Sequence, residues 1–201
     1  SSAASDVYKR QTGEYVYFID CDDYLMDGAL KRLLDLAEEK QAVMTTGNKY
    51  SSWFKPVNFD FEKAKQETFI EGVKPLEGQT LRDRFVEMYS VQHFLIRRDF
   101  VMEHELSFDT TTRFYSDMTF CVKLLKLASG KMWVDGDSLY IWRHRNDQIH
   151  LPALCQKKRG HRSGEFLDAY DKCLHIIKPE DKDLRLSLIH ISEPTRRVVI
   201  S

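Results

Sequence analysis

Three carboxylates lie within a stretch of four residues near the beginning of the chain. Asp20, Asp22 and Asp23 follow residues 15–19, a continuous run of aromatic and β-branched side chains. Such a run is typical of a strand buried on both faces, as in a parallel sheet, and ligand sites lie at the carboxyl ends of such strands. Crowded carboxylates repel one another unless a cation lies among them, and Mg²⁺ or Mn²⁺ takes one or two carboxylates together with substrate phosphates. The pattern predicts a metal that carries a diphosphate, with a solvated acidic turn as the alternative.

A fourth carboxylate, Asp117, stands at the beginning of an expected helix. The apolar residues after it recur at the spacing of one helix face: Met118, Cys121, Val122 and Leu125. An Asp in the first turn of a helix is commonly a cap that matches the helix dipole. The residues alone therefore favour a capping role for Asp117.

Basic side chains gather near residue 144. Residues 139–142 have the composition of a strand, which leads into Arg143, His144 and Arg145. Arginine suits phosphate because its planar guanidinium donates two parallel charge-assisted hydrogen bonds. An ordinary basic loop is the alternative.

The elements that position these groups alternate between strand and helix. Residues 27–40 have the apolar stripe of a helix, and residues 42–46 form an expected strand that ends at Gly47-Asn48. A strand–helix–strand unit indicates an α/β sheet with right-handed crossovers. A further helix is expected over residues 164–177, and an irregular insertion over residues 49–78.

Residues 15–25, YVYFIDCDDYL, resemble the Asp-x-Asp strand of family 2 glycosyltransferases, with Cys21 where that family usually has Ser or Ala. The resemblance implies the GT-A fold, an α/β, Rossmann-related mixed sheet flanked by helices. It also implies that Asp20 and Asp22 bind the sugar-nucleotide donor and a Mn²⁺ or Mg²⁺ ion, with Asp23 in support.

Two later segments resemble the same family. Tyr115-Ser116-Asp117 is similar to a Tyr-Glu-Asp motif whose last residue is the general base, although Ser116 replaces the Glu. The resemblance implies that Arg143 and Arg145 contact the donor pyrophosphate and that His144 completes the metal shell. Residues 144–147 and 151–156 also resemble the glycosyltransferase-like domain joined to glycerophosphotransferases of wall teichoic acid and capsule synthesis.

The implied function is that of an inverting, metal-dependent glycosyltransferase. It would transfer a sugar from a nucleotide-diphosphate sugar to a hydroxyl of a glycan or polyol-phosphate acceptor, in a cell-surface polysaccharide or wall polymer. A haloacid-dehalogenase-type phosphatase also begins with a hydrophobic strand and Asp-x-Asp, but Tyr24 stands where that family has Thr or Val. The second alternative is a non-catalytic module that binds a glycan or a partner.

Composition narrows the choice of partners and location. The net charge of -1, with 42% hydrophobic and 30% charged residues, argues against nucleic acid as a partner. No apolar run approaches the roughly 20 residues that span a bilayer. The four cysteines are scattered without a Cys-x-x-Cys pair, which excludes a standard zinc site and indicates reduced thiols. A cytoplasmic location is expected, and it is compatible with peripheral association of the full-length protein at the inner face of the membrane.

The two ends of the chain lack the apolar periodicity of the rest. Residues 1–11 and 185–201 resemble adaptor-derived read-through, so residues 12–184 are expected to be a partial GT-A domain. The N-terminal half of the nucleotide-binding sheet is expected to be missing, and the fragment by itself is expected to be inactive.

Overall fold

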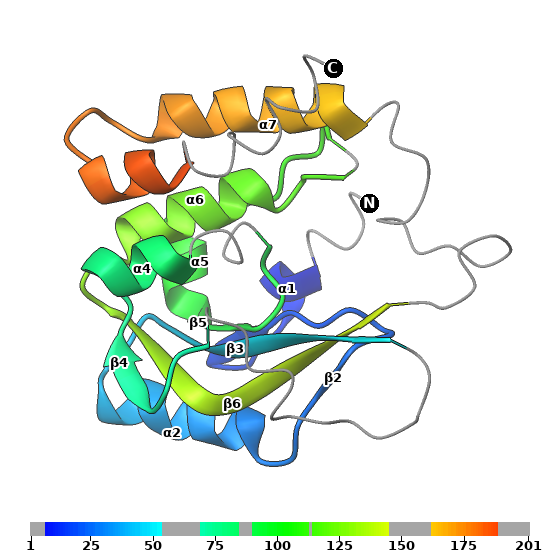
Figure 1. Ribbon diagram of the computed structural model, residues 1–201, viewed down its shortest axis with the longest axis vertical. Helices are drawn as coiled ribbons and strands as arrows, with labels where there is room; N and C mark the ends of the chain where they lie inside the picture. Colours follow the sequence, from blue (N-terminus) through cyan, green and yellow to red (C-terminus); the bar gives the residue numbers. More distant parts are fainter. Residues whose placement is uncertain (1–6, 54–68, 85–89, 113, 145–161, 189–201) are drawn as a thin grey trace, which may run out of the picture.

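A mixed β-sheet lies between a helix on one face and several helices on the other (Figure 1). The computed structural model describes residues 7–53, 69–84, 90–112, 114–144 and 162–188. In these residues the helix α2 (Ala29–Glu39) covers one face of the sheet. The helices α4 (Gly78–Arg84), α5 (Arg98–Glu103), α6 (Met118–Leu127) and α7 (Arg162–Ile176) lie on the other side. This arrangement confirms the predicted α/β class with a mixed sheet flanked by helices.

The sheet order places sequence neighbours far apart. The strands are β1 (Tyr15–Tyr17), β2 (Tyr24–Leu25), β3 (Met44–Trp53), β4 (Val73–Pro75), β5 (Phe94–Arg97) and β6 (Met132–His144). Their order is β1-β5-β3-β6-β2, and β4 pairs with β6. Among the described strand pairs β3 and β6 run parallel, and the others run antiparallel. The chain therefore crosses from one edge of this sheet to the other between β1 and β2.

The first strand is less buried than its sequence predicts. Val16 is buried, whereas Tyr15 and Tyr17 are only partly covered. The prediction of a strand buried on both faces as in a parallel sheet was wrong, because β1 is at the edge of the described sheet and pairs antiparallel with β5. The two tyrosines pack against a small cluster that includes Leu33 of α2.

The predicted end of the third strand at Gly47-Asn48 was also wrong. The strand β3 continues to Trp53, and its register with β6 shifts between Gly47 and Asn48. A Cβ atom on Gly47 would lie 2.1 Å from the carbonyl oxygen of Ser138. Glycine is needed here because the two backbones approach each other too closely for any side chain, so it marks an irregularity inside the strand.

The larger core cluster lies between the sheet and the helices opposite α2. The helix α6 is at its centre, with most of its residues buried, and α7 packs against it. Tyr8 of the short helix α1 (Val7–Arg10) and Leu184 and Leu188 of the helical residues 182–188 belong to the same cluster. Residues on both sides of the proposed domain boundaries thus share one core. Their origin as adaptor-derived sequence stays a prediction.

Candidate active site

The strand directions bring several segments together at one end of the strands of the sheet. The carboxyl ends of β1, β3 and β6 lie at this end of the sheet, because β3 runs parallel to β6 and both β1 and β3 run antiparallel to β5. The amino ends of β5 and β2 lie there for the same reason. The acidic residues between β1 and β2 and the residues that precede β5 therefore lie at the same end of the sheet.

Asp23 is fixed by two hydrogen bonds from β6. The Tyr140 hydroxyl donates to Oδ2 of Asp23, and the Arg143 backbone N–H donates to Oδ1 at 2.8 Å. Its own N–H donates to the Asp20 carbonyl at 3.0 Å, which closes the turn. Burial raises the pKa of Asp23 above its ordinary value, and these hydrogen bonds oppose that rise. Both carboxylate oxygens are engaged, so Asp23 positions the turn.

Asp20 and Asp22 remain as possible metal ligands. Asp20 is exposed, its Oδ2 accepts a hydrogen bond from Gln92 Nε2 at 2.8 Å, and Asp22 is partly buried. Over the described ranges no group of three or more His, Cys, Asp or Glu side chains is arranged to hold a metal. Two carboxylates still fit Mg²⁺ or Mn²⁺, since these ions usually combine one or two carboxylates with substrate phosphates and water.

The carboxylate of Asp117 faces the same region. It makes no capping hydrogen bond to α6, and its Oδ2 instead accepts the Val91 N–H at 3.2 Å. The pKa of Asp117 is raised to about 6, mainly by burial and to a smaller extent by the charge of Asp20, whereas the hydrogen bond from Val91 and the charge of Lys49 lower it. Asp117 and Asp20 accept hydrogen bonds from the adjacent residues Val91 and Gln92, so the two carboxylates lie in one region although they are distant in the sequence. A carboxyl group with such a pKa is suited to accept a proton near neutral pH.

The structure describes the three predicted basic residues only in part. Arg143 is partly buried on β6, with its guanidinium carbon 5.9 Å from the centre of the Tyr24 ring. His144 is the last residue of β6 and is paired with Trp53, but its side chain is not described. Arg145 lies outside the described residues.

Two further residues of this region are not apparent from the sequence. Lys49 of β3 lies 4.5 Å from the Trp142 ring and lowers the pKa of Asp117. Gln92 reaches Asp20 from the segment before β5. A lysine and a glutamine outside any motif give no local signal, and only the pairing of distant strands brings them here.

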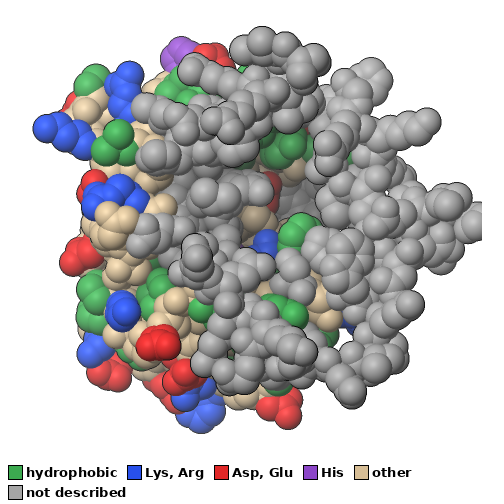
Figure 2. All heavy atoms as spheres, in the orientation of Figure 1, with side chains coloured by type: hydrophobic (Ala, Val, Ile, Leu, Met, Phe, Trp, Pro, Cys, Tyr) green, Lys and Arg blue, Asp and Glu red, His purple; other side chains and the backbone are tan. Residues whose placement is uncertain are grey.

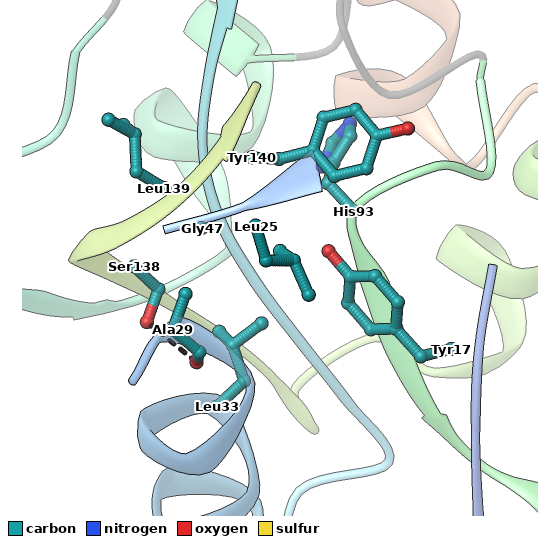
Figure 3. A pocket seen from close by; sticks show the side chains of 9 residues that line it. All are labelled: Tyr17, Leu25, Ala29, Leu33, Gly47, His93, Ser138, Leu139 and Tyr140. Atoms are coloured by element: carbon teal, nitrogen blue, oxygen red, sulfur yellow. Dashed lines mark hydrogen bonds between the residues drawn. The ribbon is translucent and has the colours of Figure 1, made fainter. Parts of the chain in front are cut away.

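A narrow hollow lies between α2 and the sheet, next to Tyr140 (Figure 3). It is lined by Tyr17, Leu25, Ala29, Leu33, Gly47, His93, Ser138, Leu139 and Tyr140. The hollow is too narrow for a water molecule, and the Tyr17 hydroxyl has no hydrogen-bond partner among the described residues. It is therefore imperfect packing beneath the site, with no room for a ligand.

The described part of the face in Figure 2 has no large area of one charge. Acidic and basic side chains alternate over it, in keeping with the net charge of -1.

Comparisons with known proteins bear on the family and the fold of this chain. The sequence model described as "Glycosyl transferase family 2" matches residues 1–104, which include the three acidic residues after β1 but not Asp117. A search of curated proteins gave no match.

The fold is similar to that of S. aureus TarS. The TarS 1–349 complex with UDP-GlcNAc is 16% identical with a TM-score of 0.67, and the match covers 92% of this chain and 49% of that one. The complex with UDP gives 16% identity and a TM-score of 0.64, covering 92% and 47%. This chain thus spans about half the length of these structures, and at such identities the similarity shows the fold alone. Because the family model matches more than half of the sequence, the chain belongs to glycosyl transferase family 2.

Proposed function

We propose that the full-length protein is an inverting, metal-dependent glycosyltransferase that uses a nucleotide-diphosphate sugar as donor. The observation that carries this proposal is that the adjacent residues Gln92 and Val91 donate hydrogen bonds to Asp20 and Asp117, in a chain of glycosyl transferase family 2. The presence of UDP or UDP-GlcNAc in structures of TarS supports a nucleotide-sugar donor. The family membership favours transfer over the phosphatase and binding-module alternatives.

The proposed chemistry is a single displacement at the anomeric carbon. Asp117 accepts the proton of the acceptor hydroxyl as its oxygen attacks that carbon, and the bond to the donor diphosphate breaks with its electrons on the leaving oxygen. Attack from the side opposite the leaving group inverts the configuration. Asp20 orients the donor, and Arg143 and Arg145 contact the departing diphosphate, where fixed positive charge stabilises developing negative charge.

Asp20 and Asp22 would hold a Mn²⁺ or Mg²⁺ ion, with His144 as a further ligand, and the ion would supply positive charge for the leaving diphosphate. Asp23 has a different task in this proposal. Its hydrogen bonds to the Tyr140 hydroxyl and the Arg143 N–H keep the acidic turn against β6. The turn is thereby held in place before any ligand binds.

The proposed acceptor is a hydroxyl of a glycan or a polyol phosphate. A protein that builds a cell-surface polymer from cytoplasmic nucleotide sugars would work at the inner face of the membrane. In the described part of the chain, no helix has the length and apolar character needed to cross a bilayer.

The experiment is to incubate the full-length protein with UDP-sugars, Mn²⁺ and candidate acceptors and to measure release of free UDP. Acceptor-dependent UDP release is the expected result. Phosphate release from a phosphomonoester would support the phosphatase instead. Binding of a glycan without turnover would support a non-catalytic module.

A further inference from the structure

The segment that precedes β5 contacts both carboxylates of the candidate site. Its residues Val91 and Gln92 donate hydrogen bonds to Asp117 and Asp20, at 3.2 Å and 2.8 Å respectively. The next residue, His93, is buried and contacts Thr46 of β3. One short segment thus joins the acidic turn, the start of α6 and the centre of the sheet.

The conformation of this segment is strongly constrained. His93 has φ +72°, a left-handed conformation that residues other than glycine rarely adopt. Its Nδ1 lies 2.8 Å from Thr46 Oγ1, and the same hydroxyl donates to the His93 carbonyl at 3.2 Å. The rings of Phe94 and Tyr140 lie 4.7 Å and 6.0 Å from the imidazole. Strained backbone of this kind persists where its surroundings fix it, and it is concentrated at functional sites.

Among the described residues, only one end of the Gln92 side-chain amide has a hydrogen-bond partner. The Asp20 carboxylate can only accept hydrogen bonds when ionised, so the Gln92 NH₂ group must face it. The carbonyl Oε1 is then the other end of the amide. This oxygen is buried and has no hydrogen-bond partner in the part of the chain that the structure describes. Buried polar atoms of this kind are normally satisfied by protein, water or ligand.

We propose that Gln92 is a substrate-binding residue whose Oε1 accepts a hydrogen bond from a sugar or polyol hydroxyl while its NH₂ group holds Asp20. A hydroxyl is the suitable donor because it is small and neutral, and because sugars and polyols carry it at many positions. This inference rests on the proposed transferase function. The hydroxyl could belong to the sugar of the donor or to the acceptor.

The test compares binding by the full-length wild-type protein and its Gln92→Leu variant, using calorimetry with Mn²⁺ present. The donor arm measures UDP-GlcNAc, UDP-glucose and UDP-galactose, with UDP as the reference that lacks a sugar. The acceptor arm measures glycerol 3-phosphate in the presence of UDP. The matched control is Gln79→Leu, the same chemical change at an exposed position of α4.

We expect Gln92→Leu to weaken binding in one arm by about tenfold, as the loss of one hydrogen bond implies. UDP affinity should change little, and Gln79→Leu should behave as wild type. Loss in the UDP-sugar arm assigns the hydroxyl to the donor, and loss in the glycerol phosphate arm assigns it to the acceptor.

Equal weakening of UDP and UDP-sugars would show that Gln92 acts only by holding Asp20, which would overturn the inference. No change in either arm would overturn it as well. Either result, together with acceptor-dependent UDP release by the wild-type protein, would leave the proposed function standing. Absence of both sugar binding and UDP release in the wild type would overturn the two together.

Discussion

Asp117 is partly buried, its pKa is raised, and it lacks the contacts of a helix cap. Its carboxylate accepts the Val91 N–H and makes no capping hydrogen bond to α6. Sequence reasoning from the residues alone favours the cap, because an Asp before an amphipathic helix usually has that role. The contact with Val91 is long-range, so no local pattern could have predicted it.

The raised pKa of Asp117 predicts a specific dependence of stability on pH. An unfolded Asp has a pKa near 3.9, whereas burial raises that of Asp117 to about 6. The folded protein therefore binds a proton on Asp117 more tightly than the unfolded chain does. The stabilisation that this bound proton provides is lost as the pH rises from about 4 to about 6. The loss is on the order of 2 to 3 kcal/mol and is constant above that range. Asp117→Asn, which cannot ionise, should not show it.

Urea unfolding at intervals of pH between 4 and 7 would measure this difference. The free energy of unfolding of the wild type should fall relative to that of Asp117→Asn as the pH rises. Parallel pH profiles for the two proteins would show that the pKa of Asp117 is not raised.

The proposed metal ligands predict stabilisation by a divalent ion. A ligand that binds only the folded state raises its stability by mass action. We expect Mn²⁺ to raise the melting temperature of the wild type and to have a much smaller effect on Asp22→Ala. Asp27→Ala is the matched control, because Asp27 is an exposed carboxylate outside the proposed site. An equal Mn²⁺ shift in all three proteins would count against Asp22 as a ligand.

At the scale of the elements, the irregularity in β3 could not be predicted from the sequence. A glycine followed by asparagine usually ends a strand, yet Gly47 permits close approach to Ser138 and β3 continues to Trp53. The extension places Lys49 beside Tyr140 in the register of β3 with β6. The helices were easier to predict: α2 was expected over residues 27–40 and is observed over Ala29–Glu39, because its apolar stripe is a local property.

Gly47→Ala should therefore be strongly destabilising. Its Cβ would lie 2.1 Å from the Ser138 carbonyl oxygen, so the two strands would have to separate. We expect a loss of about 2 kcal/mol or more in the free energy of unfolding, as for other overpacked positions. Gly164→Ala in α7 is the control, since apart from its chain neighbours and the backbone of its own helix no atom lies within 4 Å of the added Cβ. Equal stability of the two variants in urea unfolding would contradict the close approach at Gly47.

At the scale of the whole molecule, the sheet order determines which residues meet. The chain passes from β1 at one edge to β2 at the other, and β5, β3 and β6 lie between them. The acidic turn could be located from the sequence because its strand and carboxylates are contiguous, and its role as a ligand site stays a prediction. Gln92 and Lys49 could not, because their positions depend on pairings between segments that are distant in the chain.

The central claim is that the acidic turn and Asp117 form one site for sugar transfer. Its most direct test is the rate of acceptor-dependent UDP release by full-length Asp117→Asn. Asparagine keeps the shape and can still accept the Val91 N–H, but it cannot take a proton. We expect the variant to fold, to bind the donor about as tightly as wild type, and to transfer sugar at least about a hundredfold more slowly. Transfer at close to the wild-type rate would contradict the claim and place the base elsewhere.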